Sequence, residues 1–181
     1  MGLICLELVL KIRSLLFAVC CALSLSITPV LAKESAKKPQ VLHICKKNDT
    51  ELNILACNLY KEGRGEGDYG MMGVAFVTLN RKDDKNFSHT IKKIVYQRGQ
   101  FSWTFGGQSF KVYEKDRWLR AKFYAKILMR LHKDHKSLYK ALDYTKSATY
   151  YHATTVRPSW AKVMVKTVKV GNHIFYKHPD A

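Results

Sequence analysis

The sequence predicts an α+β fold that is mainly helical and has a small antiparallel β-hairpin near its C-terminus. Within residues 52–81, apolar side chains recur with the spacing of helices. Within residues 163–176, apolar and polar residues alternate on both sides of Gly171-Asn172, a pair that favours a hairpin turn. A run of helices followed by a separate antiparallel pair is typical of the α+β class.

Residues 52–81 read as two helices joined by a polar hinge. Apolar residues at i, i+3, i+4 and i+7 define one face of the first helix: Leu52, Leu55, Ala56 and Leu59. Thr50 is suited to cap it, and residues 71–79 are apolar nearly all round, which predicts a buried second helix. The hinge, residues 62–67, has three glycines that end the first helix and let the backbone approach a ligand.

Glu62 occupies the last turn of the first helix, with apolar residues on both sides. The negative end of the helix dipole and desolvation both raise the pKa of a carboxyl group there. A raised pKa suits a general acid near neutral pH. Two alternatives remain open: Glu62 is an ordinary solvated helix end, or Arg64 pairs with it and lowers its pKa.

The middle of the chain predicts three further helices. Ser88 is suited to cap a short helix over residues 90–96. Residues 114–132 form one long amphipathic helix, and residues 137–143 form another short one. The basic residues of the long helix predict a solvated face, with loose binding of an anionic polymer as the functional alternative.

Two clusters carry side chains suited to sugar binding. Gln100, Ser102 and Trp103 offer an amide, a hydroxyl and an indole, which we expect on an extended strip beside Phe101. Tyr150, Tyr151 and His152 are expected to line a cleft and form hydrogen bonds with a substrate, with His152 in a binding or orienting role. The alternative is structural, with the tryptophan and phenylalanine in the core and the histidine packed within its aromatic segment.

Four ordered blocks of this sequence resemble a known family. The first block is Tyr60 with the E-x-R-G-E string of residues 62–66 and the L-N-R string of residues 79–81. The second is the V-Y-Q-x-G-Q-F-S-W string of residues 95–103. The third is the A-T-x-Y-H-A string of residues 148–153, and the fourth is residues 170–176. Together they resemble the cell wall hydrolase family that contains the spore-cortex-lytic enzymes, with SleB-type catalytic domains. One departure is Ser147, where the family has glycine.

The resemblance implies a lysozyme-like helical domain that cleaves the glycan strand of peptidoglycan, with Glu62 as the catalytic acid. It also implies substrate binding by a larger set: Arg64, Glu66, Gln100, Phe101, Ser102, Trp103, Tyr151 and His152. Neither a metal nor a cofactor is expected, because the chain has no H-E-x-x-H motif and no compact set of His, Asp and Cys ligands.

Glycosidic cleavage usually takes two carboxylates, but only Glu62 occupies the catalytic slot of the motif. The resemblance therefore favours a lytic transglycosylase acting on the β-1,4 bond between N-acetylmuramic acid and N-acetylglucosamine, in which the substrate supplies its own nucleophile. Lysozyme-like hydrolysis of the same bond is the alternative, with a second carboxylate from the set Glu66, Asp68, Asp83 and Asp84. Three further hypotheses are a non-catalytic basic module that binds the cell wall, a peptidase or amidase using Cys57 and His152, and an assembly factor without activity.

The length and charge of the chain limit the kinds of partner that it can have. A chain of 181 residues suits one domain, and 47% hydrophobic with 25% charged residues is a globular composition. The formal charge of +17 and pI of about 9.7 call for an anionic partner. Charge alone does not choose among nucleic acid, membrane headgroups and a cell wall polymer; the resemblance selects peptidoglycan, so we expect no nucleic acid.

The N-terminus predicts export. Lys11 and Arg13 precede an apolar run over residues 15–27, and small residues at 30 and 32 suit cleavage after Ala32. Residues 1–32 are therefore expected to be a signal peptide, and the protein to reach the periplasm or cell envelope; an uncleaved segment is the only expected membrane contact. Cleavage removes Glu7 and those two basic residues, which lowers the charge by one to +16.

The remaining chain divides into a polar leader, residues 33–49, and a catalytic domain, residues 50–181. Of five cysteines, only Cys45 and Cys57 remain after cleavage. In an oxidising compartment they can form a disulfide; two separate thiols are the alternative. Two cysteines without a C-x-x-C pair make a poor zinc site.

Overall fold

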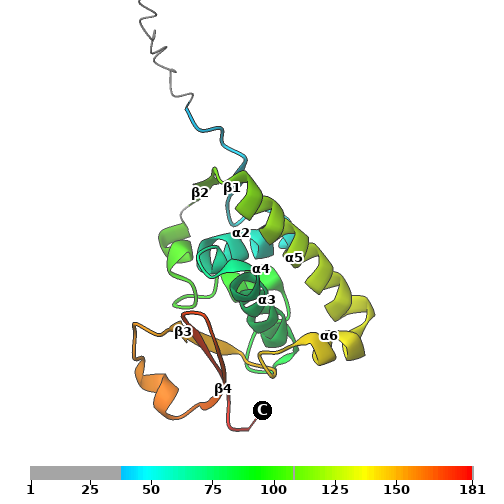
Figure 1. Cartoon of the computed structure of the whole chain (residues 1–181), viewed down its shortest axis with the longest axis vertical. Coiled ribbons are helices and arrows are strands. Elements are labelled where there is room, and N and C mark those ends of the chain that lie inside the picture. Colours follow the sequence, from blue (N-terminus) through cyan, green and yellow to red (C-terminus); the bar gives the residue numbers. More distant parts are fainter. Residues whose placement is uncertain (1–37, 108, 181) are drawn as a thin grey trace, which may run out of the picture. The chain divides into compact units, whose positions relative to one another are not determined.

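The computed structural model describes residues 38–107 and 109–180 (Figure 1). One compact unit spans Pro39–Ala181, so it begins ahead of the expected domain start at residue 50. The predicted signal peptide lies outside the described residues. Among those residues, no helix has the length and apolar character needed to cross a membrane.

Two central helices carry the core, as the sequence predicted (Figure 1). Helix α2 spans Glu51–Gly63, and the Thr50 hydroxyl caps it by accepting a hydrogen bond from the Asn53 amide at 3.2 Å. Helix α3 spans Gly67–Asp83, longer than the predicted 71–79, and is buried over most of its length. Asp68 and Asp83 therefore lie in the first and last turns of this helix.

Helix α5, Lys115–Asp134, packs on both central helices and matches its predicted range closely. Its buried stripe consists of Trp118, Ala121, Ala125 and Leu128. The sequence also predicts Leu131 in this stripe, but that residue is only partly buried. The short helices α4 (Ile91–Val95) and α6 (Lys136–Leu142) are also confirmed. The expected cap of α4 is wrong, because the Thr90 hydroxyl, not that of Ser88, accepts the hydrogen bond from the Lys93 amide at 3.3 Å.

A three-stranded antiparallel sheet covers one end of the helices. The predicted hairpin is present as β4 (Val165–Val170) and β5 (His173–Lys177). A third strand, β3 (Tyr150–Ala153), pairs with the other edge of β5 and was not predicted. The 3-10 helix η2 (Ser159–Lys162) lies in the connection from β3 to β4. The sheet packs closely on α3, because a Cβ atom at Gly73 would lie 2.6 Å from Cζ of Phe175.

A second, two-stranded sheet joins the expected leader to the domain. Strand β1 (His43–Cys45) pairs with β2 (Phe110–Val112) in antiparallel register. Cys45 and Cys57 form a disulfide with their Cα atoms 5.8 Å apart, which ties β1 to α2. Closing a loop of this size stabilises the fold by about 3 kcal/mol in the chain-entropy model.

The turn between α6 and β3 contains Ser147, the residue that departs from the family pattern. Its φ of 62° lies in the left-handed region that favours glycine. The Asp143 carboxylate holds the turn by accepting hydrogen bonds from the amides of Thr145 at 2.9 Å and Ser147 at 3.0 Å. Asn80 donates to the same carboxylate at 2.9 Å, so the strained turn is anchored to the end of α3.

We expect Ser147→Gly to stabilise the protein by about 0.5–1 kcal/mol, because it removes the left-handed strain without removing the amide hydrogen bond. Chemical denaturation measures the change. Ser137→Gly in helix α6 is the matched control and should lower stability. Equal losses in both variants would contradict the strain at Ser147.

Candidate active site

Glu62 lies in the last turn of α2, where the sequence placed it. Its side chain is partly buried, and Tyr151 on β3 donates a hydrogen bond from its hydroxyl to Oε2 at 3.4 Å. Burial raises the pKa of Glu62 above its ordinary value; the Tyr151 hydroxyl and the charge of Lys61 oppose that shift without reversing it. The expected direction of the pKa shift is confirmed, with desolvation as its main cause.

Tyr151 can act only as a donor to this carboxylate. Its burial, and then the charge of Glu62, raise the pKa of the phenol well above its ordinary value. The ring lies between sheet and helix, with centroid distances of 4.9 Å to His173 and 5.7 Å to Phe175 on β5. Because β5 packs on α3, the sheet delivers the Tyr151 hydroxyl to the end of α2.

Arg81, at the far end of α3, fixes the start of β3. Its guanidinium is buried, with 3% exposure for the residue, and Nε donates to the carbonyl of Thr149 at 2.6 Å. Three aromatic rings surround it, with centroid distances of 5.0 Å (Phe87), 5.5 Å (Phe101) and 5.6 Å (Tyr150). Burial lowers its pKa to about 10, which still leaves it charged at neutral pH. Arg81 belongs to the L-N-R motif, but the motif does not indicate this structural role.

Arg64 faces away from Glu62. Its Nη1 donates to Oε2 of Glu114 at 2.7 Å, and its guanidinium lies 4.8 Å from the centroid of the Tyr60 ring. Tyr60 donates to the same oxygen at 2.7 Å. The expected alternative, an ion pair between Arg64 and Glu62, is therefore wrong.

Glu66 fastens the hairpin to the start of α3. Its carboxylate accepts hydrogen bonds from the backbone amide of Asn172 at 2.8 Å and from the side-chain amide at 3.2 Å. These bonds, chiefly the backbone one, lower the pKa of Glu66. Gly171 permits this approach, because a Cβ atom there would lie 2.5 Å from Oε2 of Glu66.

The expected sugar-binding strip is not extended. Residues from Ser102 form a 3-10 turn, η1 (Ser102–Gly107), which buries Phe101 and Trp103 in the core. The Trp103 indole donates to Oδ1 of Asn58 on α2 at 2.9 Å. These two aromatics occupy the structural position that the sequence left as an alternative, whereas Gln100 is partly buried and Ser102 is exposed. Substrate binding by these four residues stays a prediction.

His152 follows Tyr151 along β3, so its side chain points to the opposite face of the strand. Its Nε2 lies 2.9 Å from the Tyr176 hydroxyl, and its ring stacks on that of Tyr176 at 5.2 Å. The Trp160 ring also contacts the His152 ring, with 5.6 Å between the two ring centroids. The structure does not bring His152 together with Glu62, and its predicted substrate contact stays a prediction.

The other candidate carboxylates have partners of their own. Asp68 accepts two hydrogen bonds from Arg120, both at 2.8 Å. Asp83 interacts with His132 at 3.1 Å and with Lys136. An open hollow of about 820 Å³ near Asp83 is lined neither by Glu62 nor by Tyr151, so it is separate from this site.

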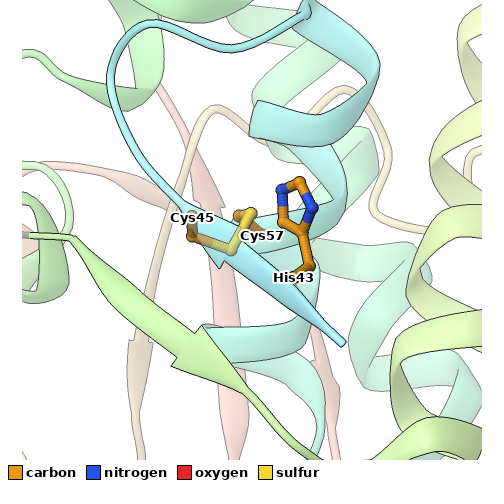
Figure 2. A group of neighbouring side chains, drawn as sticks. All are labelled: His43, Cys45 and Cys57. Carbon is orange, nitrogen blue, oxygen red and sulfur yellow. A yellow bond between two sulfur atoms is a disulfide. The ribbon is translucent and has the colours of Figure 1, made fainter. Parts of the chain in front are cut away.

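Among the described residues, one group of possible metal ligands includes Cys57 of α2. His43, Cys45 and Cys57 place their ligand atoms within 4.8 Å of one another (Figure 2). The two sulfurs are bonded to each other, so neither is the thiolate that a metal requires. The His43 ring instead interacts with Asp49 at 2.9 Å and stacks on Trp118 at 4.7 Å.

We expect Glu62→Gln to raise stability at neutral pH relative to the native chain. Below the ordinary glutamate pKa both chains carry a neutral group and should be equally stable. As pH rises through the raised pKa of Glu62, the native fold must ionise a buried carboxyl and loses stability, whereas the amide does not. Denaturation of both chains across this pH range measures the difference.

Glu66→Gln is the contrasting control, because its native pKa is lowered. Glu66 contributes stability above the ordinary pKa, and this contribution is lost as pH falls through the lowered value. The two substitutions should therefore have opposite effects at neutral pH. Effects of the same sign would contradict the environment assigned to Glu62.

Glu66→Ala should loosen the hairpin. Two hydrogen bonds to an exposed carboxylate are lost, at a cost of about 1 kcal/mol after solvent screening. Hydrogen exchange of the Asn172 amide should accelerate while that of amides in α2 does not change. An unchanged exchange rate at Asn172 would show that Glu66 does not fasten the turn.

The sequence model of the cell wall hydrolase family matches residues 65–176, more than half of the chain. The match begins three residues after Glu62, so the assignment of Glu62 rests on the motif and on its environment. A spore cortex-lytic enzyme of Bacillus cereus is 27% identical over 134 residues, covering 72% of this chain. The chain spans about half of that relative, 45% of its length.

Two solved structures are similar to this one. The catalytic domain of the Bacillus cereus SleB protein has a TM-score of 0.54 at 26% identity, covering 70% of this chain and 89% of that domain. The catalytic domain of the SleB protein from Bacillus anthracis, described as a germination-specific lytic transglycosylase, has the same score and identity and is covered to 93%. The likeness confirms the expected mainly helical, lysozyme-like fold. By sequence and by structure, this chain belongs to the cell wall hydrolase family.

Proposed function

We propose that this protein is exported and cleaves the glycan strand of peptidoglycan as a lytic transglycosylase, with Glu62 as its single acid and base. The observation that carries the proposal is the environment of Glu62: a partly buried carboxyl group with a raised pKa, in contact with a permanently protonated phenol. The relatives support the substrate class, since one is named a spore cortex-lytic enzyme and another a lytic transglycosylase.

The reaction needs two proton transfers, and Glu62 takes part in both. Protonated Glu62 donates to the glycosidic oxygen, and the bond from C1 of N-acetylmuramic acid to that oxygen breaks. The C6 hydroxyl oxygen of the same sugar then bonds to C1, and ionised Glu62 accepts the hydroxyl proton. The products are a 1,6-anhydro end and a free 4-hydroxyl on N-acetylglucosamine, with no water consumed.

The use of a single carboxylate is supported by the engagement of the others. Glu66 binds Asn172, Asp68 binds Arg120 and Asp83 binds Lys136. Asp84 accepts a hydrogen bond from the backbone amide of Asn86. Hydrolysis with two carboxylates would require one of them to leave its partner and either attack the reacting carbon or activate a water beside it. A substrate that supplies its own hydroxyl avoids that rearrangement.

Tyr151 contributes by orienting the carboxylate in both steps. Its hydroxyl donates to Oε2, which favours the ionised state that Glu62 must reach after the first proton transfer. Burial favours the protonated state that starts the reaction. The opposing influences keep the pKa within reach of both roles.

Export rests on the charged and apolar pattern of residues 1–32 and on the disulfide between Cys45 and Cys57. Disulfides persist in oxidising compartments outside the cytosol. We place the protein in the periplasm or cell envelope, where peptidoglycan is the anionic polymer at hand.

Mass analysis of soluble products from purified peptidoglycan tests the reaction. The native chain should release anhydro-muropeptides, and Glu62→Gln should lower their rate of release at least about 100-fold by removing the proton donor. Activity should also fall as pH rises through the raised pKa of Glu62, because the protonated acid is consumed. Glu51→Gln, at the opposite end of α2, is the matched control and should retain activity.

Products heavier by one water would overturn the transglycosylase and indicate hydrolysis. Release of peptides without sugar cleavage would indicate an amidase or peptidase. Binding to peptidoglycan without any product, in the native chain and in Glu62→Gln alike, would leave a binding module.

A further inference from the structure

The outward face of helix α5 carries an apolar stripe. Leu119, Phe123 and Ile127 follow one another at intervals of four residues and are 55%, 62% and 39% exposed. Residues at this spacing lie along one side of a helix. The buried stripe of α5, which includes Ala121 and Ala125, occupies the opposite side. The apolar stripe therefore points away from the core, along the helix that forms one side of the domain (Figure 1).

A row of lysines runs beside this stripe. Its four members follow at intervals of seven, four and seven residues, which places them on one side of the helix: Lys115, Lys122, Lys126 and Lys133. Within the described part of the chain, none of the four forms an ion pair with a carboxylate, whereas Arg120 pairs with Asp68 and Arg130 with Asp134. The apolar stripe and the unpaired lysines together make up what we call the α5 face.

This combination is typical of helices that lie in the plane of a membrane surface. There the apolar side chains enter the boundary between headgroups and acyl chains, and the cations contact anionic headgroups. Helix α5 has seven Lys and Arg residues and two Asp residues, so its charge complements an anionic surface. Its 20 residues span about 30 Å, long enough to lay the whole face on a bilayer.

A cell wall polymer fits the α5 face less well. Sugars bind through aromatic ring faces and hydrogen bonds. Of the three apolar side chains of the stripe, Phe123 alone has a ring face to offer. Leu119 and Ile127 are aliphatic, and their transfer from water to a hydrated glycan would gain little. In the boundary region of a bilayer all three side chains leave water.

We propose that the α5 face binds a membrane surface rich in anionic lipids, with α5 lying parallel to the bilayer. This contact is separate from the proposed active site, since it uses neither Glu62 nor Tyr151. Its effect would be to hold the folded domain against the membrane after cleavage of the signal peptide.

Fluorescence of an indole placed in the face tests the proposal in the full chain. Phe123→Trp is mixed with vesicles of phosphatidylcholine alone or with added phosphatidylglycerol, in both cases with brominated acyl chains. We expect a blue shift and quenching of the new emission only with phosphatidylglycerol. The three native tryptophans also emit, so the native chain is measured in parallel and its signal is subtracted. The difference reports on position 123 of α5, so binding by the N-terminal apolar run does not mimic it. Val163→Trp, at another exposed apolar position, is the reporter control and should not be quenched.

Two pairs of substitutions that change the net charge equally distinguish binding by the lysine row from attraction of the whole basic protein to an anionic membrane. In the Phe123→Trp background, Lys122→Gln with Lys126→Gln should weaken vesicle-dependent quenching at least about tenfold in lipid concentration. Lys166→Gln with Lys169→Gln, on β4, should leave it nearly unchanged. Leu119→Ser with Ile127→Ser should abolish the quenching.

Three results would overturn the proposal. One is the absence of quenching with phosphatidylglycerol vesicles. Another is equal weakening by both lysine pairs, which would mean that only total charge matters. The third is loss of binding to purified peptidoglycan in the lysine or serine variants without any vesicle contact, which would assign the α5 face to the wall polymer.

Discussion

The packing of the three-stranded sheet on α3 is the contact on which the candidate active site depends. It is fastened at three points along this helix. Glu66 binds the Asn172 turn at the start, Gly73 admits the ring of Phe175 in the middle, and Arg81 binds the Thr149 carbonyl at the end. Without these three contacts β3 would not carry Tyr151 to α2, and Glu62 would be an ordinary exposed helix end.

The contact at Arg81 is energetically unusual, because it buries a charge away from any carboxylate partner that the structure describes. Burying an unpaired cation is costly. The faces of three aromatic rings offset part of that cost through cation–π attraction, which strengthens where water is excluded. The lowered pKa records the remaining cost. An aliphatic side chain would avoid the cost, but it could not hold the Thr149 carbonyl and so align the strand that carries Tyr151.

The sequence predicted those structural features that depend on residues close together in the chain. Periodicity identified α2, α3 and α5, and Gly171-Asn172 identified the hairpin, because these signals are local. Glu62 was placed correctly for the same reason, since a helix end and its glycines are visible in the chain. Strand β3 was missed because four residues carry too little pattern, and its identity as a strand comes from pairing with β5.

The contacts that the sequence did not indicate share one cause, which is a partner distant in sequence. Arg64 donates a hydrogen bond to Glu114, which lies 50 residues later in the sequence, and Glu66 accepts one from Asn172, which lies 106 residues later. No spacing rule connects such pairs. An indole suits both a sugar-binding site and a protein core, so the residue type alone does not place Trp103. In the structure Trp103 is buried, and its indole donates a hydrogen bond to Asn58 on another helix. In each case the contact that the side chain makes depends on tertiary packing, which the local pattern does not show.

The high positive charge makes the position of the acid informative. A chain with a formal charge of +17 surrounds its carboxylates with positive potential, which favours their ionised form. Glu66, Asp68 and Asp83 follow that tendency, and partners lower the pKa of each. Glu62 departs from it because desolvation outweighs the nearby charge of Lys61. A protein suited to an anionic polymer must shield its proton donor from its own cations, and burial between the end of α2 and β3 provides that shield.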